Sequence, residues 1–293
     1  MGHEYLTEKR LRAFDPQLHS QYKNCVVVSN QMLSQYQSTF PEYTDHSTLH
    51  TLEIIDSCNA LIGNQIDRLT ADDLYVLLMG ALFHDVGMGI SEKDFYSFYS
   101  ETISDEKVSF SKEEIQELIR KNHHELSGWF LKKYWHVFDI PNDAYAKAII
   151  QVCRGHRKTD LFDPAEFPEP FFVAEGRSVA LPYLAALIRL ADELDIASGR
   201  NSTILYDPML IKNDVSRLEF LKHQSIQTEE ILPAGILVKA ASDDPKICEG
   251  VMDAVSKLAE VLHYCREVVS KRTSFTIQQQ RIILDLNSSL VLL

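Results

Sequence analysis

Histidines and aspartates with the donor atoms of a metal site recur through the first two-thirds of the 293-residue chain. They come in the order His50, the adjacent pair His84-Asp85, and Asp192. A carboxylate at Asp192, within an otherwise apolar stretch, would be costly to bury unless it were paired or bound to a metal ion. Imidazole and carboxylate groups that converge from separate helices supply the donors that a divalent ion requires. The pattern therefore predicts a divalent metal site inside a helical protein.

The periodicity of apolar residues predicts helices for the segments that carry these side chains. Residues 70–73 form a variant of a capping box, which predicts a helix that begins there and ends near the His84-Asp85 pair. Apolar residues at spacings of three and four indicate further helices. The helices expected in this way span about residues 17–36, 46–62, 70–83, 112–135, 143–155, 184–196 and 245–271.

Residues 162–182 interrupt the helical pattern, because four prolines fall within this stretch. We expect a loop or lid there, since the stretch also carries several aromatic residues. After residue 200 the pattern changes to short apolar runs that favour strands, with a turn at Pro233-Ala-Gly. The strands expected there span residues 218–221, 226–228 and 236–238.

These elements predict a mainly α fold, a helical bundle with a small β-hairpin or sheet element and a C-terminal helix. The expected division is a helical metal-binding domain over residues 1–200, a small β element packed on it over 201–240, and a C-terminal helical segment over 241–293. The chain ends on Ser-Ser-Leu-Val-Leu-Leu over residues 288–293, and this apolar end suggests a chain cut from a longer protein.

Composition excludes several classes of protein. The formal net charge is −13, which disfavours non-specific binding to duplex nucleic acid because that binding depends on Lys and Arg. No apolar window reaches ~18 residues, so we expect no membrane span. The five cysteines form no CxxC pair, which favours reduced thiols and a cytoplasmic protein.

The order and flanks of the four ligand candidates resemble those of the HD superfamily of metal-dependent phosphohydrolases over about residues 40–200. Residues 82–89, Leu-Phe-His-Asp-Val-Gly-Met-Gly, are similar to the doublet signature that names the superfamily. Residues 188–195, Ile-Arg-Leu-Ala-Asp-Glu-Leu-Asp, are similar to its terminal aspartate helix. The resemblance implies that the primary metal ligands are His50, His84, Asp85 and Asp192.

Two further histidine-bearing segments resemble those of superfamily members that bind two ions. The resemblance implies that His156 and one residue of the His123-His124 pair bind a second ion, with Asp85 bridging the two. We favour His124 because it lies four residues before Gly128, and we keep His123 as the alternative ligand. His156 could instead be a surface residue in a basic turn.

His46 lies one helical turn before His50, on the same side of the expected helix. Class I cyclic-nucleotide phosphodiesterases, which are relatives within the superfamily, place a general acid at this offset, so the resemblance implies that role for His46. The alternative is an ordinary residue at the helix N-terminus. Glu193 and Asp195 could orient a ligand histidine, or they could lie on a solvated helix face.

Cations are needed to bind the remaining charge of a phosphate group. Local basic clusters in an acidic protein would attract such an anion. The best-placed candidates are Arg157, Lys158, Arg189 and Arg200, although each could be an ordinary surface charge.

The resemblance implies hydrolysis of a phosphoester or phosphoanhydride in a nucleotide-type substrate by a metal-activated hydroxide. A site rich in histidine and bridged by a carboxylate suits one or two ions of manganese, iron, nickel or cobalt better than magnesium alone. Two alternatives remain at this point. One is a non-catalytic nucleotide-binding or regulatory HD module, and the other is a single-strand nuclease, which the net charge disfavours.

A second resemblance concerns residues 190–196 and 221–226, Leu-Lys-His-Gln-Ser-Ile. These segments are similar to HD domains joined to GHKL-type, heat-shock-chaperone-like ATPase modules in bacterial conflict systems. That resemblance implies an ATPase-type domain as a partner in the full-length protein. A homo-oligomer is also compatible with the sequence.

Overall fold

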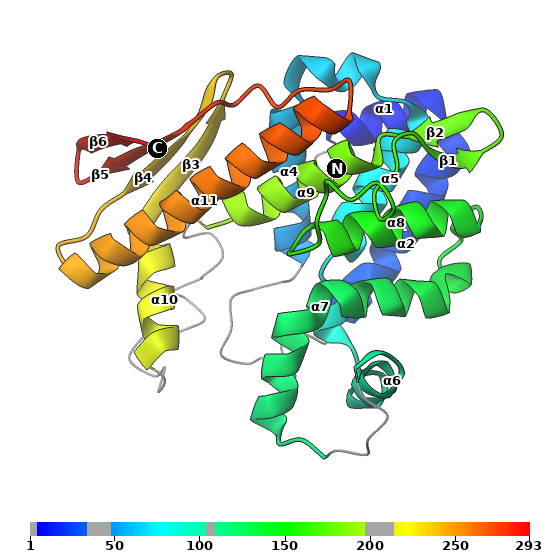
Figure 1. Cartoon of the computed structure of the whole chain (residues 1–293), viewed down its shortest axis with the longest axis horizontal. Coiled ribbons are helices and arrows are strands. Elements are labelled where there is room, and N and C mark those ends of the chain that lie inside the picture. The colour runs from blue at the N-terminus through cyan, green and yellow to red at the C-terminus, as the bar shows by residue number, and fades with distance from the viewer. Residues whose placement is uncertain (1–4, 34–47, 104–108, 197–213) are drawn as a thin grey trace.

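Helices carry most of the chain in the computed structural model, which describes residues 5–33, 48–103, 109–196 and 214–293 (Figure 1). The mainly α fold with a small sheet, predicted from the sequence, is confirmed. The helices that carry the candidate ligands are α4 (Thr48–Ile62), α5 (Ala71–Phe83), α7 (Lys112–Tyr134), α8 (Asp143–Gly155) and α9 (Leu181–Leu194).

Local sequence explains where these helices begin. Thr70 and Asp73 form a capping box at the start of α5, and Ser111 and Glu114 form another at the start of α7. The Asn142 side chain accepts from the backbone at the start of α8. Each cap satisfies backbone N–H groups that the first turn leaves without partners.

Helix α9 lies at the centre of the fold, and it packs against α4, α5, α8 and α11 (Pro245–Arg272). Its residues from Leu181 to Ala191 are buried, which agrees with a sequence that is apolar on nearly all faces. Gly155, at the end of α8, permits close packing here, because an added Cβ would lie 2.8 Å from the Cβ of Ala185.

Other helices cover this central layer. Helices α1 (Leu6–Phe14) and α2 (Pro16–Leu33) pack on α5, and α6 (Glu92–Thr102) packs on α7. Short 3-10 helices complete the helical part, and their bounds are η1 (Gly63–Arg68), η2 (Val86–Gly89) and η3 (Trp135–Val137).

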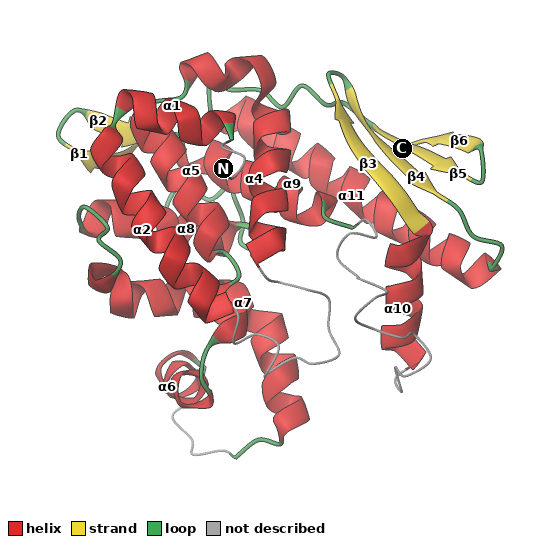
Figure 2. Cartoon of the chain, turned by 180° about the vertical axis from the view of Figure 1, so that it is seen from behind, coloured by secondary structure: helices red, strands yellow, loops and turns green. Residues whose placement is uncertain are grey.

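A four-stranded sheet lies beside α11, as the view from behind shows (Figure 2). Its strands are β3 (Ile226–Leu232), β4 (Gly235–Ala240), β5 (Ile282–Leu286) and β6 (Ser289–Leu292), in that order. The predicted strands over 226–228 and 236–238 and the turn between them are confirmed. Strands β4 and β5 are parallel, with α11 as the crossover between them. One sheet thus joins strands from the segments 201–240 and 241–293.

Three predictions of secondary structure are wrong. The segment 241–293, expected to be helical, is helical only in α11, and its end forms strands β5 and β6. Residues 218–221 lie in helix α10 (Asp214–Ser225), where Phe220 is buried and Leu218 is exposed. Four residues are too few for the sequence to distinguish a strand from one turn of helix. The proline-rich stretch, predicted as a loop, contains a hairpin formed by β1 (Phe171–Ala174) and β2 (Arg177–Val179).

No single helix in the described ranges is long and apolar enough to cross a membrane. One bent pair, Ala71–Gly89 with Glu92–Thr102, has the length and composition of a span when its two parts are taken together.

Candidate metal centre

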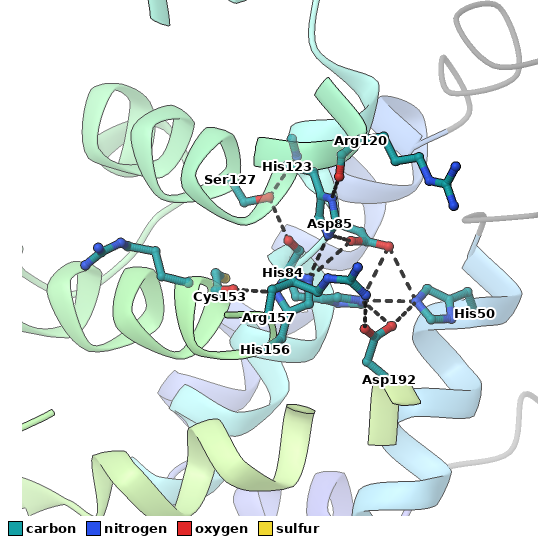
Figure 3. Close-up of polar contacts among 12 residues, drawn as sticks. His50, His84, Asp85, Arg120, His123, Ser127, Cys153, His156, Arg157 and Asp192 are labelled. Atoms are coloured by element: carbon teal, nitrogen blue, oxygen red, sulfur yellow. Dashed lines mark hydrogen bonds and ion pairs between the residues drawn. The ribbon is translucent and has the colours of Figure 1, made fainter. Parts of the chain in front are cut away.

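Helices α4, α5 and α9 bring the four primary candidates together in the interior. His50, His84 and Asp85 are buried, and Asp192 lies beside them (Figure 3). The Nε2 atoms of His50 and His84 are 3.0 Å apart. Oδ2 of Asp85 lies 3.5 Å from Nε2 of His50 and 3.6 Å from that of His84. Oδ1 of Asp192 lies 3.5 and 4.0 Å from the same two nitrogens.

A second group of donor atoms forms on the other carboxylate oxygen of Asp85. Oδ1 of Asp85 lies 3.4 Å from Nε2 of His123, on α7, and 3.7 Å from Nε2 of His156, at the end of α8. The two Nε2 atoms are 3.0 Å apart. Asp85 therefore offers one oxygen to each group, which is the arrangement of a carboxylate that bridges two ions.

The hydrogen bond that Nδ1 makes shows which nitrogen of each ring carries the proton. Nδ1 of His84 donates to the carbonyl of Ala81 at 2.9 Å, and Nδ1 of His123 donates to the carbonyl of Arg120 at 2.7 Å. His156 makes the same bond to the carbonyl three residues before it. Because a carbonyl oxygen can only accept, Nδ1 carries the proton in each ring and Nε2 presents a lone pair to the centre.

His50 reaches the same state through a carboxylate. Its Nδ1 is hydrogen-bonded to Oδ2 of Asp195. Asp195 is buried at the C-terminal end of α9, three residues after the ligand candidate Asp192. Asp195 thus lies where it can orient a ligand histidine, the role considered for it from the sequence.

The spacing of these donor atoms fits a bound cation. Two lone pairs that face each other at 3.0 Å cannot form a hydrogen bond and repel each other unless a cation lies between them. Two ligand atoms about 2.1 Å from one ion lie roughly 3.0 Å apart at a right angle and roughly 3.6 Å apart at 120°. The separations within the two groups are 3.0 to 4.0 Å, and all but the 4.0 Å between Asp192 and His84 fall close to that range.

Burial keeps the rings of His84 and His156 neutral. It lowers the pKa of His84 and lowers that of His156 well below its usual value. Burial and the neighbouring Asp85 act to raise the pKa of Asp192, but His84, His50 and Arg157 outweigh them and the net pKa is lowered. Neutral imidazole and ionised carboxylate are the forms that bind metal ions.

The turn after α5 is held against α7, which sets the distance between Asp85 and His123. The hydroxyl of Ser127 donates to the carbonyl of His84 at 2.6 Å and accepts from the backbone N–H of Gly87 at 2.9 Å. An added Cβ at Gly87 would lie 2.7 Å from the backbone nitrogen of Ser127 and closer still to the His123 carbonyl. Only glycine permits this approach of the two backbones.

The choice between the adjacent histidines of α7 is corrected by the structure. His123 contacts Asp85 and His156, whereas Nε2 of His124 lies 3.8 Å from Oε1 of Glu125. Adjacent residues of an α-helix point about 100° apart, so only one of the two can face Asp85. Burial lowers the pKa of His124 to about 3, so it is a neutral ring beside the centre.

Comparison with known families agrees with this geometry. The model of the HD-CE family matches residues 40–274, which is most of the chain. The chain belongs to the HD-CE family. The predicted resemblance to HD-type domains is thereby confirmed, while the link to ATPase-joined conflict systems stays a prediction. Searches of the curated proteins and of the solved structures gave no match.

The candidate phosphate-binding residues of this HD-CE domain lie in different environments in the structure. Arg157 lies at the centre, with Nη1 3.8 Å from Oδ2 of Asp192, and Lys158 is exposed beyond it. Arg189 is 9% exposed, and it donates to the carbonyls of Gly155 and Thr159. The prediction that Arg189 binds phosphate is corrected, because it fastens the end of α8 to α9. His46 and Arg200 lie outside the described residues.

A pocket of about 210 Å³ opens beside the donor groups and exposes Asp85, His123 and Asp192. The charged and imidazole side chains that complete its lining are Arg157, Glu193, Glu219, Lys222, His223 and Lys257. Lys222 and His223 fall within residues 221–226, for which the sequence predicted no role at the site. Their place in a short basic run was the available signal, and only tertiary structure brings α10 to the metal centre.

Proposed function

We propose that this HD-CE domain is a metal-dependent phosphohydrolase that cleaves a phosphoester or phosphoanhydride bond of a nucleotide-type substrate. The observation that carries the proposal is the pair of donor groups that share Asp85, with both sets of Nε2 lone pairs directed inward. Membership of an HD-type family supports the same reading.

The chain supplies fixed ligands that need no rearrangement. Asp85 would hold two ions together, and the Nδ1 bonds of the four histidines would keep each Nε2 in place. Divalent ions bound there supply Lewis acidity toward phosphoryl oxygens and lower the pKa of water. Nitrogen-rich donor sets favour manganese, iron, nickel or cobalt over magnesium alone.

The substrate would enter through the pocket beside Asp192. Arg157 is suited to bind phosphate oxygens, because its side chain is 39% exposed and its guanidinium lies at the edge of the donor groups. In this position it would orient the phosphate and offset negative charge that develops on its oxygens.

Elemental analysis tests the proposal directly. We expect about two transition-metal ions per chain in the wild type, by analogy with carboxylate-bridged two-metal sites. Asp85→Ala should lose both ions and all hydrolysis of bis(p-nitrophenyl) phosphate and nucleotides, because each group loses an oxygen ligand.

The matched control is Asp67→Ala, which changes an aspartate whose side chain is 74% exposed. It should retain both metal and turnover, and circular dichroism should show unchanged helicity in both variants. Metal and turnover retained in Asp85→Ala would contradict the assignment. Absence of metal from the wild type, even after manganese or iron is supplied, would favour the non-catalytic module.

A further inference from the structure

Helix α10 contributes a lysine to the pocket that exposes the metal donors. Lys222 lines this pocket together with Arg157, Glu219 and Lys257. Its helix is attached close to the donor groups, because Nδ1 of His223 donates to the carbonyl of Ile196 at 2.8 Å, just after α9 ends. The proposed hydrolysis at Asp85 does not require these α10 residues, so their charge calls for a separate explanation.

Lys222 is held in position by its neighbours. Its side chain is 13% exposed, which is low for a lysine. The methylene stem packs on Gly250 of α11, where an added Cβ would lie 3.3 Å from Cδ of Lys222. Its ammonium forms an ion pair with Glu219, whose side chain is 51% exposed. The stem is therefore buried while the charged end stays at the pocket, paired with a carboxylate that solvent can reach.

The charges that line the pocket suit an anion with several negative charges. Four carboxylates and three cations are present among the described residues of the lining. Each of the three cations has a carboxylate partner within the pocket, namely Lys222 with Glu219, Lys257 with Glu193 at 2.7 Å, and Arg157 with Asp192 at 3.8 Å. Two divalent ions at Asp85 would change the net charge of the lining from −1 to +3. A phosphate monoester carries at most about two negative charges and would leave part of this charge unmatched.

We infer that Lys222 binds a second phosphate group of the substrate, beyond the first phosphate at Arg157 and the metal donors, so that the pocket selects anions with at least two phosphates over phosphate monoesters. The inference rests on the proposed function for the first phosphate, which lies at the metal donors. Lys222 forms an ion pair with Glu219, and the second phosphate of the substrate would replace this carboxylate. The shared chemistry is two phosphate groups, which either a nucleoside polyphosphate or a dinucleotide provides.

Calorimetry on the manganese-loaded full chain, in saturating manganese, tests this inference by binding rather than turnover. The probes are AMP, α,β-methylene-ADP and cyclic di-AMP. AMP carries one phosphate group, α,β-methylene-ADP carries two that are directly linked, and cyclic di-AMP carries two that are separated by nucleosides. Wild type should bind one of the two-phosphate probes more tightly than AMP. Lys222→Gln should weaken that probe about tenfold, as expected for one charge-assisted hydrogen bond, and leave AMP unchanged.

Three variants control the result. Lys222→Arg keeps the charge and should retain the preference, whereas Glu219→Gln removes the competing carboxylate and should tighten the two-phosphate probe. Lys271→Gln makes the same charge change at a lysine that pairs with Glu267 near the end of α11, and it should behave as wild type. Metal content should stay the same in all of them.

Two results would overturn the inference. One is a wild type that binds AMP as tightly as both two-phosphate probes, and the other is a Lys222→Gln variant that keeps the full preference. A different result would contradict the proposed function alone. If the preference holds and depends on Lys222 but no phosphate compound is hydrolysed, the anion site stands and the phosphohydrolase assignment falls.

Discussion

The position of one ring proton decides whether each histidine of the centre can bind a metal ion. His84, His123 and His156 donate Nδ1–H to a backbone carbonyl three residues earlier in the same helix, which leaves Nε2 directed at Asp85. His50 depends on a side chain instead, since its Nδ1 bond goes to Asp195. A substitution can therefore remove the hydrogen bond that orients His50 in the first group, whereas the backbone carbonyls that orient the histidines of the second group cannot be removed in this way.

We predict that Asp195→Asn lowers metal affinity at the first group by about 10- to 100-fold, because a neutral amide supports the His50 ring less well than a carboxylate. The matched control is Glu193→Gln, which removes a nearby carboxylate that pairs with Lys257. Metal titration with competition by a chelator would measure both. Equal affinity in the two variants would show that the Asp195 contact does not tune the site.

The adjacent histidines of α7 give a second prediction. His123→Ala should reduce the metal content from about two ions to about one, because it removes a ligand of the second group only. His124→Ala should retain both ions, since that ring contacts Glu125 rather than Asp85. Elemental analysis of the two proteins side by side distinguishes these outcomes, and the reverse pattern would restore His124 as the ligand.

At the scale of elements, the contact between η2 and α7 brings the two donor groups within reach of one carboxylate. The backbone of Gly87 lies against that of α7, and Ser127 bridges this contact by hydrogen bonds in both directions. Helix packing alone does not fix a distance of this kind, because interhelical distances vary with the side chains at the contact. A small residue and a hydroxyl at one crossing therefore determine whether Asp85 can bridge.

We predict that Gly87→Ala lowers the free energy of unfolding by about 1–3 kcal/mol and weakens the second metal group, because the new methyl group meets backbone atoms that cannot rotate away. Gly250→Ala is the control, since its Cβ meets only the flexible stem of Lys222 and alanine favours a helix. Urea denaturation and metal analysis measure the two effects. A Gly87→Ala protein with wild-type stability would contradict the close approach.

At the scale of the whole molecule, α11 joins the sheet to the helical part. It packs on α9, which carries Asp192, and on β5 near the C-terminus. Ile282 and Leu284 of β5 are fully buried, and the strand runs parallel to β4. The sheet thus shares one hydrophobic core with the helices that carry the candidate metal ligands.

We predict that Leu284→Ala lowers the free energy of unfolding by about 2–5 kcal/mol, because it leaves a cavity in that core. Leu290→Ala, in the next strand, should change it by less than about 0.5 kcal/mol, since Leu290 is 71% exposed. Urea denaturation followed by circular dichroism measures both. A single transition that shifts for Leu284→Ala would show that the sheet and the helices unfold together.

Local patterns in the sequence are sufficient to predict the helices of the candidate metal site and its first four ligand candidates. The expected helices over 70–83, 112–135 and 143–155 agree closely with α5, α7 and α8, because caps and apolar periodicity are local signals. His50 and Asp192 lie on helices, and His84 and Asp85 directly follow the end of α5. The apolar pattern of each of these helices is evident from its own residues.

Features that depend on contact with another element become evident in the folded chain alone. His123 replaces His124 because the position of η2 selects the face of α7 that meets Asp85. Arg189 is a structural residue because the end of α8 lies against it. The four residues 218–221 are helical, and residues 282–292 form strands that were not predicted, because the pairing of β5 with β4 joins residues more than forty apart. Contacts between distant segments leave no periodic pattern in either segment, so the sequence does not display them.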